Sequence, residues 1–405
     1  MALLARRGLT ISQSHGRVLI YSHDSFGLGH IRRCRTIAHA LAEAFPKLKV
    51  LIVSGSPIIG SFDFKTRVDF VRVPGIIKLR NGDYVPLGEH GSIQETTALR
   101  SSLIGETALA FAPDLFIVDK EALGLRGELE GTLEKLKARG TRLVLGLRDV
   151  LDEPEALALE WQRKRVIPAV EQLYDDIWVY GLKAIYDPLA GLGLSANVGT
   201  KTTFTGYLRR SRPSAMPAAT FTDIGQRILV TAGGGGDGEL LIDWALRAYE
   251  QDASALPPAL IVPGPFMRAD LRTVFEQRAS AIAQVSMLTF EPRMEHLMAE
   301  CLAVASMGGY NTFCEILSFD KRALLVPRHT PRLEQTIRAE AAERLGLIRM
   351  LRDPDGAPDP NIMIEALRSM PDQALPSRWP TPGLLDGLTT IVDQCGAWFG
   401  QAARG

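Results

Sequence analysis

Three glycine-rich turns are the first features of this sequence that could do chemistry. The turn Gly27–His30 (GLGH) sets a histidine beside two glycines, Gly233–Gly238 (GGGGDG) leaves its backbone amides uncovered, and Ser306–Asn311 (SMGGYN) contains another glycine pair. Backbone N–H groups at such turns, and at the start of a following helix, can hold a phosphate or diphosphate. An imidazole at a helix N-terminus tends to stay neutral and can accept a proton.

Neither of the first two turns matches a standard nucleotide motif. Gly27–His30 lacks the third glycine of the dinucleotide fingerprint, and Gly233–Gly238 lacks the lysine and hydroxyl residue of a P-loop. Taken singly, each has a plain structural explanation: a histidine that packs at a turn, or a flexible glycine turn. Their interpretation as binding loops depends on where they fall in the fold.

Two later segments supply side chains suited to sugar hydroxyls. Glu315 comes six residues after Gly309, within the first turns of an expected helix, where its carboxylate could bind both hydroxyls of a ribose. Glu334 and Gln335 follow a strand and a Pro turn, and each could contact vicinal hydroxyls. The alternatives are an exposed glutamate favoured by the helix dipole and the solvated start of a helix.

Strands and helices alternate along the chain and would position these turns. Short runs rich in Val, Ile and Leu occur at 17–22, 49–54 and 114–118, and the rhythm restarts at 227–232 and 302–306. Near-continuous apolar strands separated by helices indicate parallel sheets covered on both faces. We therefore predict an α/β chain with two doubly wound, Rossmann-like domains, whose ligands bind at the carboxyl ends of the strands.

The break in this rhythm suggests the domain boundaries. Residues 208–226 are rich in Pro, Ser, Ala and Arg, as interdomain linkers are. The predicted divisions are a flexible arm at 1–16, a first domain at 17–210, a linker at 211–226, a second domain at 227–383 and a final helix at 384–405. That helix could pack back on the first domain.

Composition narrows the class of protein. The 405 residues include 46 Lys and Arg against 46 Asp and Glu, which argues against a general nucleic-acid binder. Four cysteines without a CxxC pair favour a reducing, cytoplasmic compartment, and no apolar run is long enough to span a bilayer.

The first half of the chain has an excess of positive charge, because residues 1–212 carry 29 basic and 23 acidic residues. This excess could favour an anionic acceptor or peripheral contact with the inner face of a membrane, or be chance scatter.

The order of these features resembles the GT-B glycosyltransferases, and most closely the MurG-like, UDP-sugar-dependent enzymes. The specific part is residues 306–335 (SMGGYNTFCEILSFDKRALLVPRHTPRLEQ), and GLGH is similar to the family's glycine-rich loop that ends in histidine. The resemblance implies two Rossmann-like domains that face a central cleft, the first for the acceptor and the second for a nucleotide sugar. Two departures are Arg33, where the family loop has a proline, and Asp237, which would repel a diphosphate unless it points elsewhere.

The resemblance also implies roles for residues. His30 would be the catalytic base, with Asp119 orienting it through a ring N–H, and Gly27 and Gly29 would lie on the acceptor side. Asp119 could equally be a carboxylate that stabilises its loop. Arg148 ends a predicted strand, where it could hold an anionic group on the acceptor side or pair with Asp149. The implied donor-binding residues are Gly234, Gly235, Gly236, Phe290, Met294, Ser306, Gly308, Gly309, Asn311, Thr312, Glu315, Glu334 and Gln335.

The implied activity is an inverting, metal-independent glycosyl transfer of the hexosyltransferase class. The donor would be a UDP-sugar, and no cofactor would be needed. The acceptor would be a hydroxyl compound that could be lipid-linked or belong to cell-surface polysaccharide or glycolipid synthesis.

The sequence Asp353-Pro354-Asp355 resembles a metal-binding DxD motif, but its Pro/Gly-rich context favours a surface turn. Two alternatives remain open: a sugar-nucleotide epimerase or hydrolase on the same scaffold, and a catalytically silent partner subunit. The sequence leaves the donor sugar, the acceptor, the oligomeric state and membrane association undecided.

Overall fold

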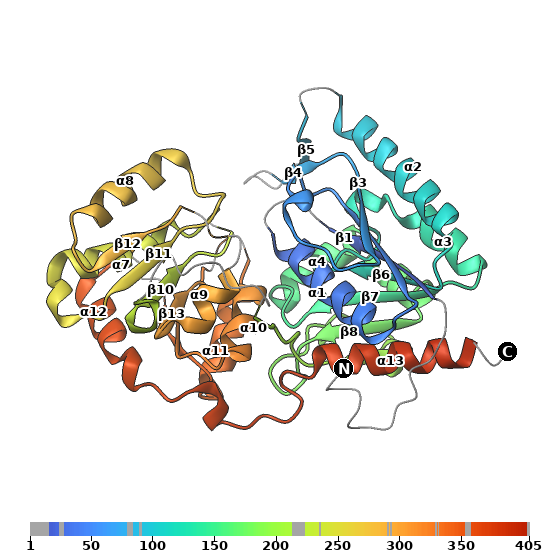
Figure 1. The fold of residues 1–405 in the computed structure, drawn as a ribbon. Coiled ribbons are helices and arrows are strands. Elements are labelled where there is room, and N and C mark those ends of the chain that lie inside the picture. The colour runs from blue at the N-terminus through green and yellow to red at the C-terminus, as the bar shows by residue number, and fades with distance from the viewer. Residues whose placement is uncertain are drawn as a thin grey trace. The chain divides into compact units, whose positions relative to one another are not determined.

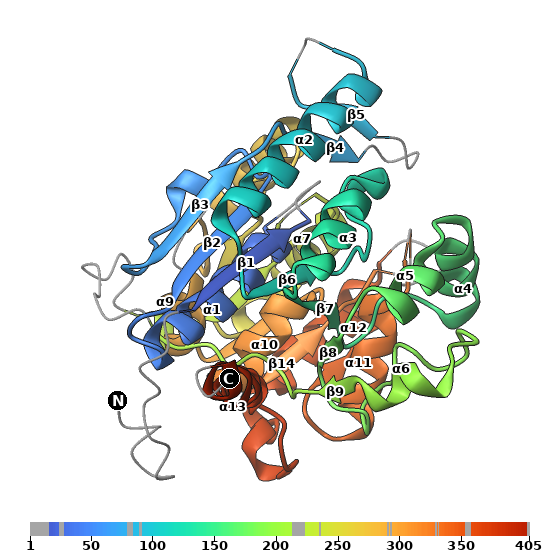
Figure 2. The ribbon, with the colours of Figure 1, turned by 90° about the vertical axis from the view of Figure 1, so that its right-hand side faces the viewer.

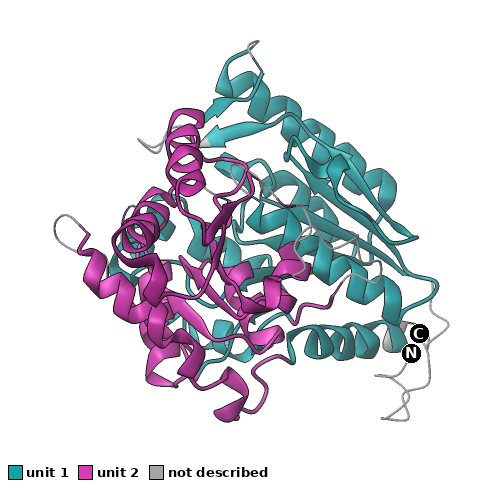
Figure 3. Cartoon of the chain, turned by 60° about the vertical axis from the view of Figure 1, so that its left-hand side comes forward, with its two compact units in different colours: residues 1–183, 187–208, 386–405 teal, residues 184–186, 209–385 magenta. Residues whose placement is uncertain are grey.

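A computed structural model describes residues 16–23, 28–78, 84–88, 91–212, 223–234, 236–289, 291, 294–328, 330, 332–352 and 358–402. The chain forms two compact units, coloured separately in Figure 3. Unit 1 comprises residues 1–183, 187–208 and 386–405, and unit 2 comprises residues 184–186 and 209–385. Most of the predicted linker, residues 213–222, lies outside the described residues.

Unit 1 is built on a seven-stranded parallel sheet with the order β3-β2-β1-β6-β7-β8-β9 (Figure 1). Its strands are rich in Val, Ile and Leu because helices cover both faces, α1 and α13 on one side and α2 and α3 on the other (Figure 2). The strands are β1 (Arg17–Ser22), β2 (Lys49–Ser54), β3 (Val68–Arg72), β6 (Leu115–Asp119), β7 (Arg142–Arg148), β8 (Asp176–Tyr180) and β9 (Thr202–Phe204). The helices before residue 209 are α1 (Gly29–Ala44), α2 (Ile93–Phe111), α3 (Glu130–Ala138), α4 (Pro154–Arg163), α5 (Val166–Gln172) and α6 (Ala196–Thr200), and β4 (Ile76–Lys78) and β5 (Tyr84–Pro86) form a separate antiparallel pair.

The strand order of unit 1 reverses at β1. This strand pairs in parallel with β2 on one side and with β6 on the other. The connection after β1 therefore leads toward one edge of the sheet, and the connection after β6 leads toward the other edge. Doubly wound sheets bind their ligands at such a switch point. The residues that follow β1 and β6 are therefore brought together there.

The C-terminal helix α13 (Gly387–Ala402) belongs to unit 1. The rings of Phe399 and Phe45 meet edge to face at 5.6 Å, and the indoles of Trp398 and Trp178 stack at 5.9 Å. Trp178 Nε1 also donates to Gln394 Oε1 at 2.6 Å. Aromatic packing and these polar contacts hold the last helix against residues more than two hundred positions earlier in the chain.

Unit 2 repeats the design with a six-stranded parallel sheet, β12-β11-β10-β13-β14-β15. Its switch point lies between β10 and β13, which pair in parallel with Thr231 opposite Ser306. The strands are β10 (Ile228–Thr231), β11 (Ala259–Val262), β12 (Val285–Met287), β13 (Ala303–Ser306), β14 (Ala323–Leu325) and β15 (Arg349–Met350). The helices are α7 (Glu239–Asp252), α8 (Ala269–Ser280), α9 (Met294–Glu300), α10 (Tyr310–Ser318), α11 (Glu334–Arg344) and α12 (Pro360–Ser369).

These two sheets confirm the predicted α/β class with two doubly wound, Rossmann-like domains. In the part of the chain that is described, none of the helices combines the length and apolar character needed to cross a bilayer. Within the same residues, no three His, Cys, Asp or Glu side chains gather in a group that could hold a metal ion.

Candidate functional site

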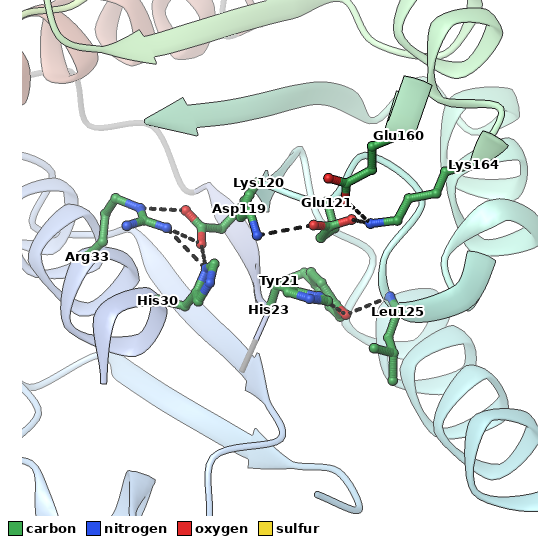
Figure 4. A network of polar contacts seen from close by, with 10 residues as sticks. All are labelled: Tyr21, His23, His30, Arg33, Asp119, Lys120, Glu121, Leu125, Glu160 and Lys164. Carbon is green, nitrogen blue, oxygen red and sulfur yellow. Dashed lines mark hydrogen bonds and ion pairs between the residues drawn. The ribbon is translucent and has the colours of Figure 1, made fainter. Parts of the chain in front are cut away.

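His30 and Asp119 meet at the switch point of unit 1. His30 is the second residue of α1, Asp119 is the last residue of β6, and His30 Nδ1 lies 2.5 Å from Asp119 Oδ2 (Figure 4). A nitrogen and a carboxylate oxygen this close share a proton, so we assign the hydrogen to Nδ1 and the lone pair to Nε2. The pair thus has the orientation that a proton-accepting histidine needs.

Arg33 is a third member of this cluster, although in the sequence it stands out only as a departure from the family. Its Nε donates to Asp119 Oδ1 at 2.7 Å and its Nη2 donates to Asp119 Oδ2 at 2.6 Å, while the residue is 1% exposed. Arg33 lies three residues after His30, one helical turn along the same face of α1. That spacing is the sequence signal that could have placed it beside His30.

The electrostatics of this cluster keep the imidazole neutral. Burial lowers the pKa of His30 below its ordinary value, Asp119 acts in the opposite direction, and Arg33 lowers it further. Burial alone would raise the pKa of Asp119, but the Arg33 guanidinium and His30 hold it below the usual carboxyl range. At neutral pH the site therefore contains a carboxylate, a guanidinium and an uncharged imidazole.

A second polar group surrounds His23, which directly follows β1. Its ring meets the His30 ring edge to face at 5.6 Å, and burial lowers its pKa well below the ordinary value. Nearby, Glu121 is bound by Lys120 at 3.2 Å and by Lys164 at 2.9 Å (Figure 4). This group was not predicted from the sequence, although the end of a parallel strand at a switch point is where functional side chains collect.

The other residues predicted on the acceptor side are Gly27, Gly29 and Arg148. Gly29 opens α1, Gly27 lies outside the described residues, and Arg148 ends β7. Asp149 Oδ2 accepts a hydrogen bond from Tyr207 Oη at 2.9 Å. The neighbouring carboxylate therefore has a partner within unit 1 other than Arg148.

In unit 2, the turns after three strands meet at the switch point. A Cβ atom placed on Gly233, after β10, would lie 3.7 Å from Thr312 Oγ1, after β13. Phe266 N, after β11, donates to Gly234 O at 3.0 Å. The predicted Gly234 makes one of these contacts and Gly236 follows in the same turn, whereas Gly235 lies outside the described residues.

The turn before α10 combines a glycine in a positive-φ conformation with a glycine beside open space. Gly308 has φ +76°, its N–H points to Ser306 Oγ at 3.4 Å, and a Cβ there would lie 2.9 Å from Leu325 Cδ1. Gly309 caps α10, and a Cβ on it would meet no atom within 4 Å. The first N–H groups of a helix have no intrahelical acceptor and carry positive partial charge. Helix N-termini of this kind bind phosphates, and the open Cβ direction of Gly309 leaves room for a ligand at the start of α10.

A pair of alanine variants tests this turn. We expect Gly308→Ala to lose about 1–3 kcal/mol of unfolding free energy, because alanine disfavours a positive φ and its methyl would meet Leu325. Gly309→Ala adds the same methyl toward open space at φ −57° and should stay within about 0.5 kcal/mol of wild type. Urea unfolding of both variants provides the measurement, and equal losses would contradict the assignment.

Two further predicted residues, Asn311 and Thr312, belong to the first turn of α10, and both are buried. Asn311 Oδ1 accepts a hydrogen bond from Arg210 Nη2 at 2.7 Å. Glu315 follows one turn later and is 1% exposed, so the alternative of an exposed, dipole-favoured glutamate is wrong. A carboxylate is buried only where other groups compensate its charge, and this one lies close behind the glycine turn in sequence.

Arg328 organises the polar residues after β14. Its Nε lies 2.6 Å from Asp237 Oδ2, its Nη2 donates to Glu334 Oε1 at 2.8 Å, and its backbone N donates to Gln335 Oε1 at 3.2 Å. Asp237 therefore points to a cation, whose charge offsets the repulsion that Asp237 would otherwise exert on a diphosphate. Glu334 Oε2 is buried and has no hydrogen-bond partner among the described residues.

Met294 and Ser306 are two more of the predicted donor-binding residues. Met294 begins α9 and is partly buried, and Ser306 ends β13 and is buried. Phe290 lies outside the described residues, as does the turn that contains Asp353 and Asp355.

The second unit matches a known family. Residues 261–374 match the glycosyltransferase family 28 C-terminal domain, a stretch that contains Gly308, Gly309, Glu315, Glu334 and Gln335. This domain match, together with the GT-B structures below, supports the coarser part of the resemblance seen in the sequence. No curated protein matches the chain.

Solved structures with the same fold cover nearly the whole chain. The calicheamicin glycosyltransferase CalG4 is 15% identical with a TM-score of 0.60 and covers 96% of this chain and 99% of its own. UGT2 of Phytolacca americana, solved with UDP-2fluoro-glucose and pterostilbene, is 13% identical with a TM-score of 0.61 over 94% of each chain. A Listeria monocytogenes protein described as a UDP-N-acetylglucosamine 2-epimerase is 12% identical with a TM-score of 0.61, over 95% of this chain and 97% of its own. At these identities the likeness shows the GT-B fold.

Proposed function

We propose that this chain is a glycosyltransferase that moves a sugar from a nucleotide diphosphate sugar to a hydroxyl acceptor, with inversion at the anomeric carbon and without a required metal ion. The observation that carries the proposal is the assembly in unit 2, where the turn after β10, the Gly308–Gly309 turn and the start of α10 meet at one switch point. The family 28 domain match over residues 261–374 supports it independently.

The donor's diphosphate would bind at these amides. As the bond between the anomeric carbon and the diphosphate oxygen breaks, the leaving group gains negative charge, and preorganised N–H groups lower the energy of that state. Glu334 Oε2 has no hydrogen-bond partner among the described residues, and it would accept a hydrogen bond from a hydroxyl of the donor sugar. Glu315 would bind the ribose.

His30 would complete the reaction from unit 1. Its Nε2 lone pair would take the proton of the acceptor hydroxyl while that oxygen attacks the anomeric carbon from the face opposite the leaving group. The result is an inverted glycosidic bond, a nucleoside diphosphate and a protonated His30 that returns its proton to solvent. Asp119 would hold the ring in the required tautomer, as its 2.5 Å contact with Nδ1 suggests.

UDP is the nucleotide that we propose, within the MurG-like, hexosyl-transferring group. The resemblance of residues 306–335 supports this choice, and the Phytolacca enzyme of the same fold was solved with UDP-2fluoro-glucose. Calorimetric titration with UDP, GDP and ADP tests it. We expect UDP to bind most tightly. Binding of another nucleotide in its place would overturn the nucleobase assignment, and binding of none would favour a catalytically silent partner subunit.

Replacing Glu315 with glutamine should weaken UDP binding by about 10–100-fold, because hydrogen bonds to a charged carboxylate contribute about 1.5–3 kcal/mol. The matched control is Glu340→Gln on α11, where the carboxylate pairs with Arg352 and is 40% exposed. The same titration with 2′-deoxy-UDP isolates the ribose contact. If the deoxy ligand loses equal affinity for wild type and for Glu315→Gln, Glu315 does not bind the 2′-hydroxyl.

A second candidate function is sugar-nucleotide epimerisation, favoured by the similarity to the Listeria protein described as a 2-epimerase. Incubation with the donor alone separates the two. An epimerase converts the sugar without an acceptor, whereas the proposed transferase forms its glycoside only when an acceptor is added.

We extend the proposal to a cytoplasmic protein whose acceptor is lipid-linked at the inner face of a membrane. The support is the charge of the first half of the chain, in which residues 1–212 carry 29 basic against 23 acidic residues. Basic segments are attracted to anionic lipid surfaces and to phosphate-bearing acceptors.

A further inference from the structure

Asp119 has more partners than the orientation of one histidine requires. Asp119 Oδ2 lies 2.5 Å from His30 Nδ1 and accepts a hydrogen bond from Arg33 Nη2 at 2.6 Å. Asp119 Oδ1 accepts a second hydrogen bond, from Arg33 Nε at 2.7 Å. The side chains of Arg33 and Asp119 are 2% and 1% exposed. The guanidinium is therefore a buried, two-point clamp on the carboxylate.

We propose that Arg33 is a positioning residue of the transfer reaction: it locks the Asp119 carboxylate and offsets its charge, so that Asp119 orients the His30 ring without drawing a proton onto it. This inference rests on the proposed function, in which His30 is the base. A bidentate guanidinium stops rotation of the carboxylate, and its charge opposes the attraction between that carboxylate and an imidazolium.

The distance between Arg33 and the ring supports the electrostatic part. Arg33 Nη2 comes within 3.1 Å of His30 Nδ1. Because that nitrogen already carries the proton shared with Asp119, the approach is not a hydrogen bond between them. It places a fixed positive charge where an imidazolium would have to form, and buried charges interact strongly.

The other groups that face His30 act in known directions. Burial lowers the pKa of His30 and Asp119 raises it, while Arg33 on α1 and Lys120 after β6 lower it. His23, after β1, packs against the ring, and its own neutral form is favoured by burial. Removal of the Arg33 charge should therefore let Asp119 raise the pKa of His30, and the base would be lost to protonation at higher pH.

Unit 1 contains a matched control for the structural role of such a clamp. Arg100 Nε donates to Glu128 Oε2 at 2.7 Å and Arg100 Nη2 donates to Glu128 Oε1 at 2.6 Å, and the two side chains are 2% and 0% exposed. Glu128 Oε1 also accepts a hydrogen bond from the Tyr21 hydroxyl at 2.6 Å, so this carboxylate faces a phenol where Asp119 faces an imidazole. Breaking it should cost stability as breaking the Arg33 pair does, without a direct effect on His30.

The test compares Arg33→Met, Arg33→Lys, the double variant Arg33→Met with Asp119→Asn, and Arg100→Met in the full-length chain. Two quantities are measured: the NMR titration of the His30 ring, and kcat/KM against pH. In Arg33→Met we expect the titration to move to higher pH, and the ratio of kcat/KM at pH 6 to that at pH 8 to fall at least about threefold. Arg33→Lys keeps the positive charge, so its shift should be smaller than that of Arg33→Met. The double variant should show little shift because both charges are gone.

The Arg100→Met variant should lose stability and keep the wild-type His30 titration. The inference is overturned if the His30 ring of Arg33→Met titrates like that of wild type. Should Arg33→Met not fold, it is overturned if Arg33→Lys titrates like wild type, or if the double variant titrates at clearly higher pH than wild type. Failure of the proposed function has a different signature. Wild type would then form no glycoside from any nucleotide sugar, while the NMR titration would still decide the effect of Arg33 on His30.

Discussion

Replacing His30 with alanine should lower kcat for glycosyl transfer by about 10²–10⁴-fold, the usual contribution of a general base, and leave nucleotide affinity unchanged. The reason is that Nε2 is the proposed acceptor of the substrate proton, whereas the proposed nucleotide site is built from residues of unit 2. Steady-state kinetics with a saturating donor and calorimetry with UDP measure the two effects separately.

The control is His39→Ala, on the same helix α1. His39 Nε2 accepts a hydrogen bond from Lys65 N at 3.3 Å, and burial lowers its pKa to about 4. It is a perturbed, partly buried histidine outside the Asp119 cluster, and its removal should leave kcat within about twofold of wild type. An unchanged kcat in His30→Ala would show that another group accepts the proton.

Replacing Asp119 with alanine should cost unit 1 about 3–5 kcal/mol of unfolding free energy, because Arg33 would remain buried without its carboxylate. Urea unfolding, with hydrogen exchange to report each unit separately, measures the loss. Asp119 has a depressed pKa, so its contribution is present above the ordinary carboxyl pKa and is lost as pH falls below about 4. The difference between wild type and Asp119→Ala should shrink over that acidic range.

An exposed pair in the same unit sets the scale. Glu43 and Lys65 lie 2.8 Å apart, and the Glu43 side chain is 63% exposed. Solvent screens such a pair, so Glu43→Ala should change stability by less than about 1 kcal/mol. A loss in Asp119→Ala no larger than that in Glu43→Ala would refute the buried clamp between Asp119 and Arg33.

The strands and the chemistry of their end loops were predictable from local patterns. RVLIYS and KVLIVS were predicted as strands, and the structure has β1 and β2 at Arg17–Ser22 and Lys49–Ser54. A run of branched apolar residues that ends in a small polar residue carries this information within six positions. The glycine turns after β1, β10 and β13 follow from the same reasoning, because parallel strands place their ligand-binding loops at the carboxyl ends.

The pairing of charges inside each unit could not be predicted in the same way. Arg33 was read only as a departure from the family pattern, yet it is buried against Asp119, 86 residues away. Asp237 was expected to repel a diphosphate unless it points elsewhere, and the partner it points to, Arg328 in the turn after another strand, could not be named from the sequence. Periodicity shows that a residue lies on a helix or in a turn, but it carries no information about a partner from a distant strand.

The amino-acid order alone was enough to specify two doubly wound sheets and the turns at their carboxyl ends, since apolar periodicity and glycine act over a few residues. Folding was needed to place Arg33 against the predicted pair of His30 and Asp119, and to bury Glu315. Those outcomes depend on strand order and on packing between distant segments, which place buried charges beside partners from other parts of the chain.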